Sequence, residues 1–263
     1  MSTLGPEPEK RQIESESSPN VALEPRKQRS DTGARITPRD KNAIRWIAQQ
    51  YAIRLDHLQI LLARLTPPGT VQPKESGKLT LRRTQDIVDR WVVLELVCVK
   101  RYLTGEPPWI WVSSPGLKFL ANTPGFRFYV PKAANLAHLH SCNIVRLYLE
   151  KKRADDPSTV WQSEREIRAG LEPRPEGGGP HVADAEVETA RGVNAVEVEI
   201  SMKTYARLDK ILRVLAVNTR YQTIWYYAPP KIKIALEKAL AALPESFMRK
   251  FVVYDLEELE RLL

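Results

Sequence analysis

Two glutamates alternate with branched apolar residues in the segment AVEVEI at residues 195–200. Side chains alternate across a β-strand, so Glu197 and Glu199 share one face while Val196 and Val198 share the other. The valine face can pack under a helix. Carboxylates on the opposite face need water, a cationic partner or a metal ion. The segment therefore predicts a strand that carries chemistry on one face.

A third carboxylate, Asp184, lies in the run HVADAEV at residues 181–187, which predicts the preceding strand. If the two strands pair, Asp184 approaches Glu197 and Glu199. Carboxylates suit Mg²⁺ or Mn²⁺, hard ions that take further ligands from water and substrate phosphates. Such an ion lowers the pKa of bound water and stabilises charge on phosphate oxygens. Lys203, four residues after Glu199, is the candidate for orienting the attacking water.

Other polar residues near this segment admit two interpretations. Glu164 is either an additional acidic residue of the site or an ordinary glutamate at a helix start, stabilised by the helix dipole. Lys203, Arg207 and Lys210 form a basic stripe at helical spacing that either faces phosphates or is simply solvated. Both pairs of alternatives stay open at the level of sequence.

Histidine and cysteine residues occur at spacings that raise the question of zinc. His138, His140 and Cys142 lie on one predicted helix, where only His138 and Cys142 share a face. A second pair with ligand spacing is not found nearby, so we favour an interpretation without zinc. His181, three residues before Asp184, is expected to shape the start of the strand or to support a neighbouring side chain.

The C-terminal part of the chain has a regular order of predicted elements. Helical and alternating patterns predict the order α-β-β-β-α-β with a trailing α-β. The expected helices cover residues 133–152, 202–217 and 231–243, and the expected strands cover 159–161, 181–187, 194–200, 222–227 and 250–254.

The preceding part predicts three helices and a β-hairpin. A helix begins at Thr37-Pro38, and apolar spacing predicts two more over residues 55–65 and 79–94. Strands are expected over 97–103 and 109–112, joined by the turn Gly105-Glu106-Pro107-Pro108. This order is typical of a winged helix.

Charge supports a nucleic-acid partner for that part of the chain. The net charge is +8, and residues 36–126 hold thirteen basic against seven acidic side chains, an excess of six. The third helix of a helix-turn-helix domain enters the major groove of DNA. We therefore expect contacts with double-stranded DNA from a basic set on that helix and the hairpin: Lys78, Arg82, Arg83, Arg90, Lys100 and Arg101. The alternative is a helical packing module with solvated arginines.

Composition and the absence of certain motifs exclude several protein classes. Residues 1–35 are rich in charged residues, serine and proline, which predicts a disordered tail. The two cysteines, with neither a secretory signal nor an apolar run long enough for a bilayer, predict a cytoplasmic protein without a membrane partner. Glycine-rich phosphate loops and nucleophile elbows are not found, so ATPases and α/β hydrolases are set aside.

The chain contains, in this order, the motifs RDKNAIRWIA, LDHLQILLARL, LRRTQDIVDRW, WVSSPGLKFLA, WQSERE, HVAD and EVEISMK. This series of motifs resembles the replication-relaxation family of bacterial plasmid and mobile-element proteins. Residues 133–254 also resemble the PD-(D/E)xK nuclease superfamily, whose fold has the same α-β-β-β-α-β core. That resemblance implies roles for Asp184, Glu197 and position 199 as metal ligands. The sequence departs from the pattern at Glu199, which occupies the usual lysine position, and Lys203 is the candidate replacement.

Together these observations predict an α/β (α+β overall) chain in three parts: a tail (1–35), a winged helix-turn-helix domain (36–126) and a restriction-endonuclease-like domain (127–263). The expected function is that of a plasmid or mobile-element DNA-binding protein with a Mg²⁺- or Mn²⁺-dependent endonuclease-like domain that hydrolyses phosphodiester bonds. A non-catalytic accessory or regulatory protein in replication, mobilisation or transcription is the alternative, and a protein-interaction module is a third. Other replication proteins and a homodimer are open partner expectations.

Overall fold

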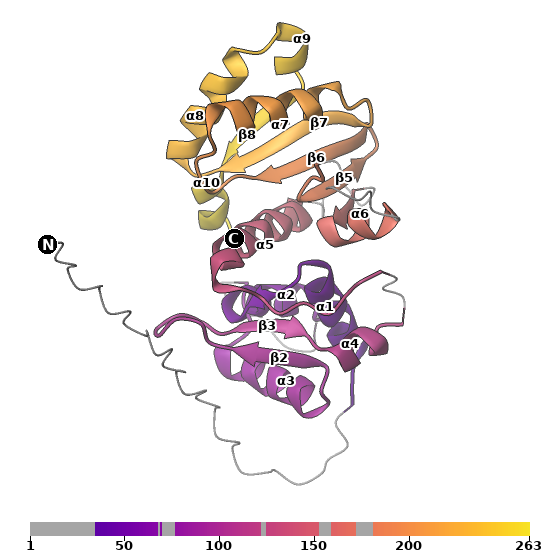
Figure 1. Cartoon of the computed structure of the whole chain (residues 1–263). Helices are drawn as coiled ribbons and strands as arrows, with labels where there is room; N and C mark the ends of the chain where they lie inside the picture. Colours follow the sequence, from indigo (N-terminus) through magenta and orange to yellow (C-terminus); the bar gives the residue numbers. More distant parts are fainter. Residues whose placement is uncertain (1–34, 68, 70–76, 122–124, 153–158, 172–180) are drawn as a thin grey trace, which may run out of the picture. The chain divides into compact units, whose positions relative to one another are not determined.

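The computed structural model describes residues 35–67, 69, 77–121, 125–152, 159–171 and 181–263 (Figure 1). The fold is mixed α/β, and Arg35–Leu263 forms one compact unit. The predicted tail, apart from Arg35, and the loop at 173–180 lie outside the described residues. Among the residues described, no helix combines the length and apolar character needed to cross a bilayer. The division at 126/127 stays a prediction.

The first half of this unit holds a small three-stranded sheet among helices. The strands run in the order β1-β3-β2, and both pairs are antiparallel. The predicted helices and hairpin are confirmed, whereas β1 is too short to show a periodic pattern. The elements are α1 (Pro38–Gln49), β1 (Ile53–Arg54), α2 (Leu55–Leu65), α3 (Leu81–Val93), β2 (Val97–Lys100), β3 (Trp109–Val112) and α4 (Ser114–Phe119).

Helix α1 begins where the sequence predicts it. The Thr37 hydroxyl accepts a hydrogen bond from the Asp40 backbone N–H at 3.2 Å, and the Asp40 carboxylate accepts one from the Thr37 N–H at 3.0 Å. This reciprocal pair satisfies two backbone donors that a helix start leaves open. Asp40 is fully buried and also pairs with Arg90 of α3, so the cap ties the first helix to the third.

Helix α4 packs very closely on the turn before β2. A Cβ atom at Gly116 would clash with the carbonyl oxygen of Leu96 and would lie 2.8 Å from a methyl carbon of Val112. Only glycine permits this approach without a shift of the backbone. The glycine of the motif WVSSPGLKFLA therefore has a packing explanation.

The second half holds a five-stranded sheet in the order β4-β5-β6-β7-β8. The pairs β4-β5 and β5-β6 are antiparallel, and β6-β7 and β7-β8 are parallel. The predicted helices and strands occur in the predicted order, with η1, α6, α9 and α10 in addition. The elements are η1 (Ala133–Asn135), α5 (Leu136–Lys152), β4 (Val160–Ser163), α6 (Glu164–Gly170), β5 (Ala185–Thr189), β6 (Gly192–Val198), α7 (Tyr205–Val217), β7 (Tyr221–Ala228), α8 (Pro230–Ala241), α9 (Glu245–Met248), β8 (Phe251–Asp255) and α10 (Leu256–Arg261).

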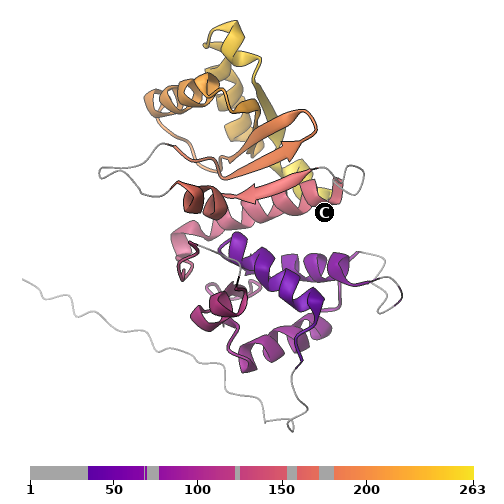
Figure 2. The ribbon, with the colours of Figure 1, turned by 90° about the vertical axis from the view of Figure 1, so that its right-hand side faces the viewer.

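Helices cover both faces of this sheet (Figures 1 and 2). Ala195 of β6 belongs to the core with α7 and α8, whereas Val196 and Val198 belong to the core with α5 and α10. Both faces of β6 are therefore buried. Glu197 and Glu199, at 8% and 6% exposure, cannot rely on bulk water and need partners inside the protein.

Helix α5 contacts both halves of the unit. Leu147 packs in the core of the first half, while Val145 packs against the five-stranded sheet. Asn143 donates a hydrogen bond to the Ala52 carbonyl at 2.9 Å, and Trp46 of α1 donates to the Glu150 carboxylate at 3.0 Å. Its apolar residues predicted the helix, but a helix with buried residues on most of its circumference gives little amphipathic signal to show which side packs where.

Candidate functional site

The start of β5 lies beside the end of β6. Ala185 pairs with Val196 in the antiparallel register, which places Asp184, one residue earlier, next to Glu197. One Asp184 oxygen, Oδ2, accepts a hydrogen bond from the Val198 backbone N–H at 2.7 Å. The predicted pairing of the two strands is confirmed. It brings two of the predicted carboxylates together at one end of the sheet.

Glu197 is buried at this position and has a histidine partner. Its Oε1 lies 2.8 Å from His181 Nε2. Burial and the nearby charge of Asp184 raise the pKa of Glu197 to about 7, although His181 and Lys203 oppose the shift. The hydrogen bond with Glu197 in turn raises the pKa of His181. The contact therefore joins two groups that both hold a proton more strongly than they would in water.

Glu199 and Lys203 form an ion pair with each other. The Ser201 N–H and hydroxyl lie 3.4 Å from Glu199 Oε1. Burial lowers the pKa of Lys203, while the charges of Glu197 and Asp184 act to raise it. Lys203 precedes α7, so the predicted helix start at Met202 is three residues early. The ion pair with Glu199 holds the Lys203 ammonium close to the end of β6.

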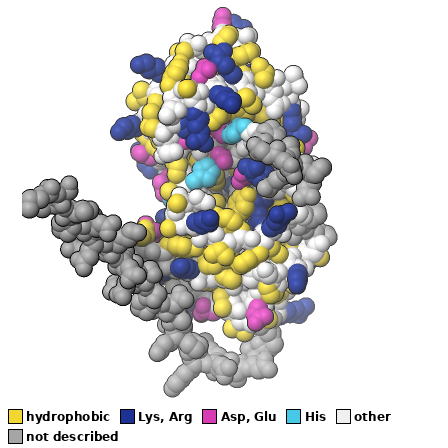
Figure 3. All heavy atoms as spheres, in the orientation of Figure 1, with side chains coloured by type: hydrophobic (Ala, Val, Ile, Leu, Met, Phe, Trp, Pro, Cys, Tyr) yellow, Lys and Arg dark blue, Asp and Glu magenta, His cyan; other side chains and the backbone are white. Residues whose placement is uncertain are grey.

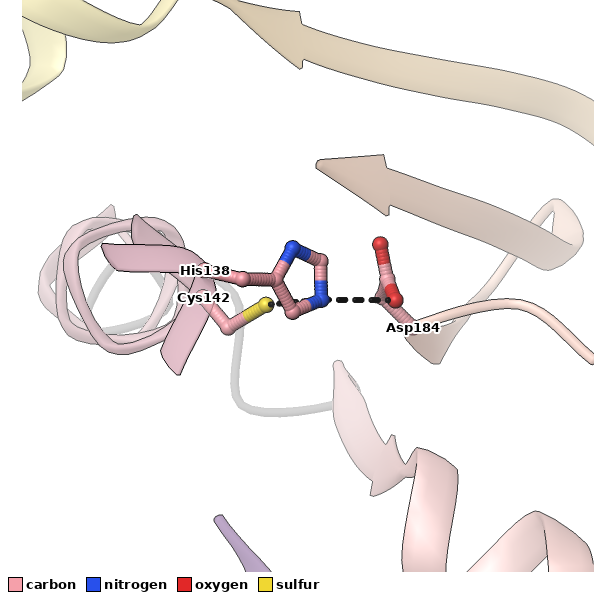
Figure 4. Close-up of side chains that lie close together, drawn as sticks. All are labelled: His138, Cys142 and Asp184. Carbon is pink, nitrogen blue, oxygen red and sulfur yellow. Dashed lines mark hydrogen bonds and ion pairs between the residues drawn. The ribbon is translucent and has the colours of Figure 1, made fainter. Parts of the chain in front are cut away.

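Asp184 also faces two side chains of α5, His138 and Cys142 (Figure 4). His138 Nε2 lies 3.1 Å from Asp184 Oδ1 and 3.4 Å from Cys142 Sγ. One ligand atom from each residue lies within 4.8 Å of the others, so the three residues could hold a metal ion. Burial alone would lower the pKa of His138, but hydrogen bonds with Asp184 and Cys142 raise it to about 11.

The sequence pattern does not reveal this trio, because its members come from two distant segments. Helical spacing groups His138 with Cys142, but no second pair with ligand spacing lies near them in the sequence. Asp184, already singled out as a strand-end carboxylate, supplies the third donor from the start of β5. A search that paired helix positions i and i+4 with strand-end acids would have found the trio.

Glu164 begins α6 beside this cluster. Its backbone N–H donates to the Asp184 carbonyl oxygen at 3.1 Å, and its carboxylate pairs with Arg168 at 2.6 Å. Its charge also contributes, after burial, to the raised pKa of Tyr51. The residue is therefore both a helix-start acid with an arginine partner and a neighbour of Asp184.

Part of the cluster is accessible from solvent, whereas Cys142, Glu197 and Glu199 are buried. The side chains of His138, His181 and Asp184 are 37%, 31% and 20% exposed. On the face drawn in Figure 3, histidine side chains lie beside acidic ones, with lysine and arginine nearby. A substrate or ion could reach this end of the sheet without unfolding the protein.

The predicted DNA-contacting residues differ in their surroundings. Arg82 and Arg83 lie exposed in the first turn of α3, and Lys78 precedes that helix, half-buried. Arg90, in contrast, pairs with Asp40 at 2.7 Å. On the hairpin, the Lys100 ammonium lies 5.0 Å from the Tyr102 ring centre, and Arg101 donates to the Glu106 carbonyl.

Comparison of the chain with protein-family models, curated proteins and solved structures gives no match.

Proposed function

We propose that this chain is a DNA-binding protein of a bacterial plasmid or mobile element, with a winged helix-turn-helix in its first half and a metal-dependent endonuclease-like centre in its second. The observation that carries the proposal is the placement of Asp184 beside Glu197 across the β5-β6 pair, with Lys203 just beyond β6. The order of strands and helices around that pair agrees with the PD-(D/E)xK resemblance. The motif order supports assignment to the replication-relaxation family.

The donor set fits Mg²⁺ or Mn²⁺. Asp184 and Glu197 offer carboxylate oxygens side by side, and burial, together with their mutual repulsion, raises the pKa of Glu197. A divalent cation would relieve that repulsion. When bound, such an ion would activate water and stabilise charge on a scissile phosphate. Glu199 would join the ligand set only by leaving its ion pair with Lys203.

The chain's own residues would position the reactants. Glu199 holds Lys203 near the two carboxylates, so that the ammonium can orient the attacking water or contact a phosphate oxygen. The His181–Glu197 pair can accept or release a proton at neutral pH. These roles need no movement of the strands.

Arg82 and Arg83 are the residues to which we assign phosphate contacts. Both side chains are exposed at the start of α3, where a recognition helix would meet DNA. The local excess of six positive charges in residues 36–126 supports the same assignment. Lys100 and Arg101 on the hairpin extend this basic surface.

A second function, that of a non-catalytic accessory or regulatory DNA-binding protein, is favoured by one specific observation. Each of the three carboxylates at this end of the sheet already has a basic side chain of the protein as its partner. The pairs are Asp184 with His138, Glu197 with His181 and Glu199 with Lys203. Such a neutralised cluster holds a fold together without a metal ion, and binding of Mg²⁺ would have to compete with these pairs.

Plasmid cleavage and manganese calorimetry separate the two functions. We expect the purified chain to nick or linearise supercoiled plasmid with Mg²⁺ or Mn²⁺, and Asp184→Asn and Lys203→Met to abolish cleavage. Glu188→Gln, an exposed acid on the same strand β5, is the matched control and should cleave normally. An intact plasmid at every protein ratio, with no Mn²⁺ binding that depends on Asp184, would establish the accessory function instead.

DNA binding has its own test. In a mobility-shift titration, Arg82→Glu combined with Arg83→Glu should weaken binding and reduce the salt dependence by about two units in the log–log slope. Lys231→Glu combined with Arg249→Glu, at two exposed positions outside residues 36–126, controls for the same change of four in net charge. Unaltered binding by the double variant would refute the assigned surface.

A further inference from the structure

His138 and Cys142 project from the same face of α5 because they are four residues apart on one helix. Asp184 meets them from the start of β5, and His138 Nε2 lies between the thiol and the carboxylate (Figure 4). Asp184 Oδ2 is fixed by the Val198 N–H, which leaves Oδ1 directed at the histidine. Two of the three donors are thus held by a helix, and the third is the residue that immediately precedes β5.

Two of the three separations between these donors, those from the histidine nitrogen, are close to the values around a tetrahedral zinc ion. Bonds of about 2.0–2.3 Å at a tetrahedral angle place neighbouring ligand atoms roughly 3.3–3.6 Å apart. The observed separations are 3.1 Å for nitrogen and oxygen and 3.4 Å for nitrogen and sulfur, with all three atoms within 4.8 Å. Small side-chain rotations would admit an ion without movement of α5 or β5.

The chemical types of the donors select the class of ion. A thiolate and an imidazole favour a borderline-soft ion, whereas Mg²⁺ takes oxygen ligands. We propose that His138, Cys142 and Asp184 form a three-ligand site for Zn²⁺, with the fourth position open to solvent. The His138 and Asp184 side chains are 37% and 20% exposed, so solvent reaches two of the three donors.

Binding of zinc forms bonds to sulfur, nitrogen and oxygen and releases protons. The Cys142 thiol proton goes to solvent, as does the second imidazole proton of His138 if it is charged beforehand, because only the thiolate and the neutral imidazole bind the ion. The hydrogen bonds among the three residues are exchanged for bonds to the ion. The site goes beyond the proposed nuclease function and does not depend on it, although both use Asp184.

Cobalt is the probe that tests this site. Co²⁺ occupies tetrahedral zinc sites and gives a thiolate-to-metal charge-transfer band when a cysteine is a ligand. Titration of the reduced, metal-free full chain with Co²⁺ should produce this band at one equivalent, and Zn²⁺ should then bleach it. Cys142→Ser should abolish the band. Cys98→Ser, which removes the other cysteine from β2, should leave it unchanged.

Affinity provides the second readout. Changes outside the ligand set already cost 10–100-fold in affinity, so His138→Asn or Cys142→Ser should weaken Zn²⁺ binding by at least about 100-fold in a competition titration. A wild-type chain without the band, or a band that survives Cys142→Ser and disappears in Cys98→Ser, would overturn the proposal. The wild-type result stands whether or not a variant folds. Plasmid cleavage plays no part in it, so failure of the nuclease proposal would be seen separately.

Discussion

Arg90 distinguishes a DNA-contacting role from a structural one. The sequence pattern groups it with Arg82 and Arg83 as a DNA contact, whereas the structure pairs it with Asp40. Its guanidinium lies 2.7 Å from the Asp40 carboxylate, which has no exposed surface. The same carboxylate also bonds to Thr37 and Arg39. We therefore predict that Arg90→Ala acts mainly on stability.

The magnitude follows from burial. Removal of one partner from a buried ion pair typically costs 3–5 kcal/mol, roughly, because the remaining charge is left uncompensated. Arg90 is 30% exposed, and Asp40 retains Thr37 and Arg39, so we expect a loss of about 2 kcal/mol in the free energy of unfolding. This corresponds to a fall in Tm of about 4–8 °C. Arg82→Ala and Arg83→Ala, at exposed positions, should change stability by less than about 0.5 kcal/mol.

The difference in stability between Arg90→Ala and the wild type should shrink as pH falls. Burial opposes ionisation of Asp40, but hydrogen bonds from Thr37 and the charges of Arg90 and Arg39 hold its pKa below the ordinary value. A lowered folded-state pKa stabilises the protein above the unfolded-state pKa, and that stability is lost as pH falls through the folded value. Without Arg90 the folded-state pKa of Asp40 rises, so the variant should lose less stability than the wild type as pH falls.

Urea unfolding followed by circular dichroism at pH 7 and pH 4, alongside a DNA mobility-shift titration, measures both effects. We expect Arg90→Ala to be destabilised with near-normal DNA affinity when assayed well below its Tm. Arg82→Ala should show the reverse. An Arg90→Ala variant as stable as the wild type but as defective in DNA binding as Arg82→Ala would refute the structural role.

Three further outcomes are expected. Gly116→Ala should destabilise the chain by about 1–3 kcal/mol, because the new methyl group would clash with the Leu96 carbonyl oxygen. Gly170→Ala, with open space around the new methyl group, should be neutral or stabilising. Thermal unfolding of the two variants measures the difference. Burial and the neighbouring His140 lower the pKa of His57 to about 3, so the unfolded chain binds a proton at this residue before the folded chain does as pH falls. The free energy of unfolding, measured with urea, should therefore fall by about 2 kcal/mol between pH 7 and pH 5. His57→Phe should remove this fall. Zn²⁺ at 100 times its Kd should add about 2.7 kcal/mol to the stability of the wild type and little to that of Cys142→Ser; equal gains in both would contradict the proposed ligand set.

Local patterns in the sequence determined most helices and strands of the described chain. Helical spacing and the Thr37 cap predicted α1, and the alternation around Glu197 predicted β6, because both signals depend on residues close together in the chain. The adjacency of Asp184 and Glu197 was also predictable, since two consecutive acidic-apolar strands that pair bring the same positions together. Strand β1, with two residues, was too short to carry a periodic signal.

The pairs of charged side chains that join distant segments were decided only by the tertiary structure. Arg90 faces Asp40 from 50 positions away, and His138 faces Asp184 from 46 positions away. Such pairs depend on how whole helices and strands pack, and periodicity within one element carries no information about that packing. The sequence by itself determined which residues could do chemistry and on which elements they lie. Packing decided whether a basic group stays at the surface or pairs with another side chain, because burial forces each charge to find its partner inside the fold.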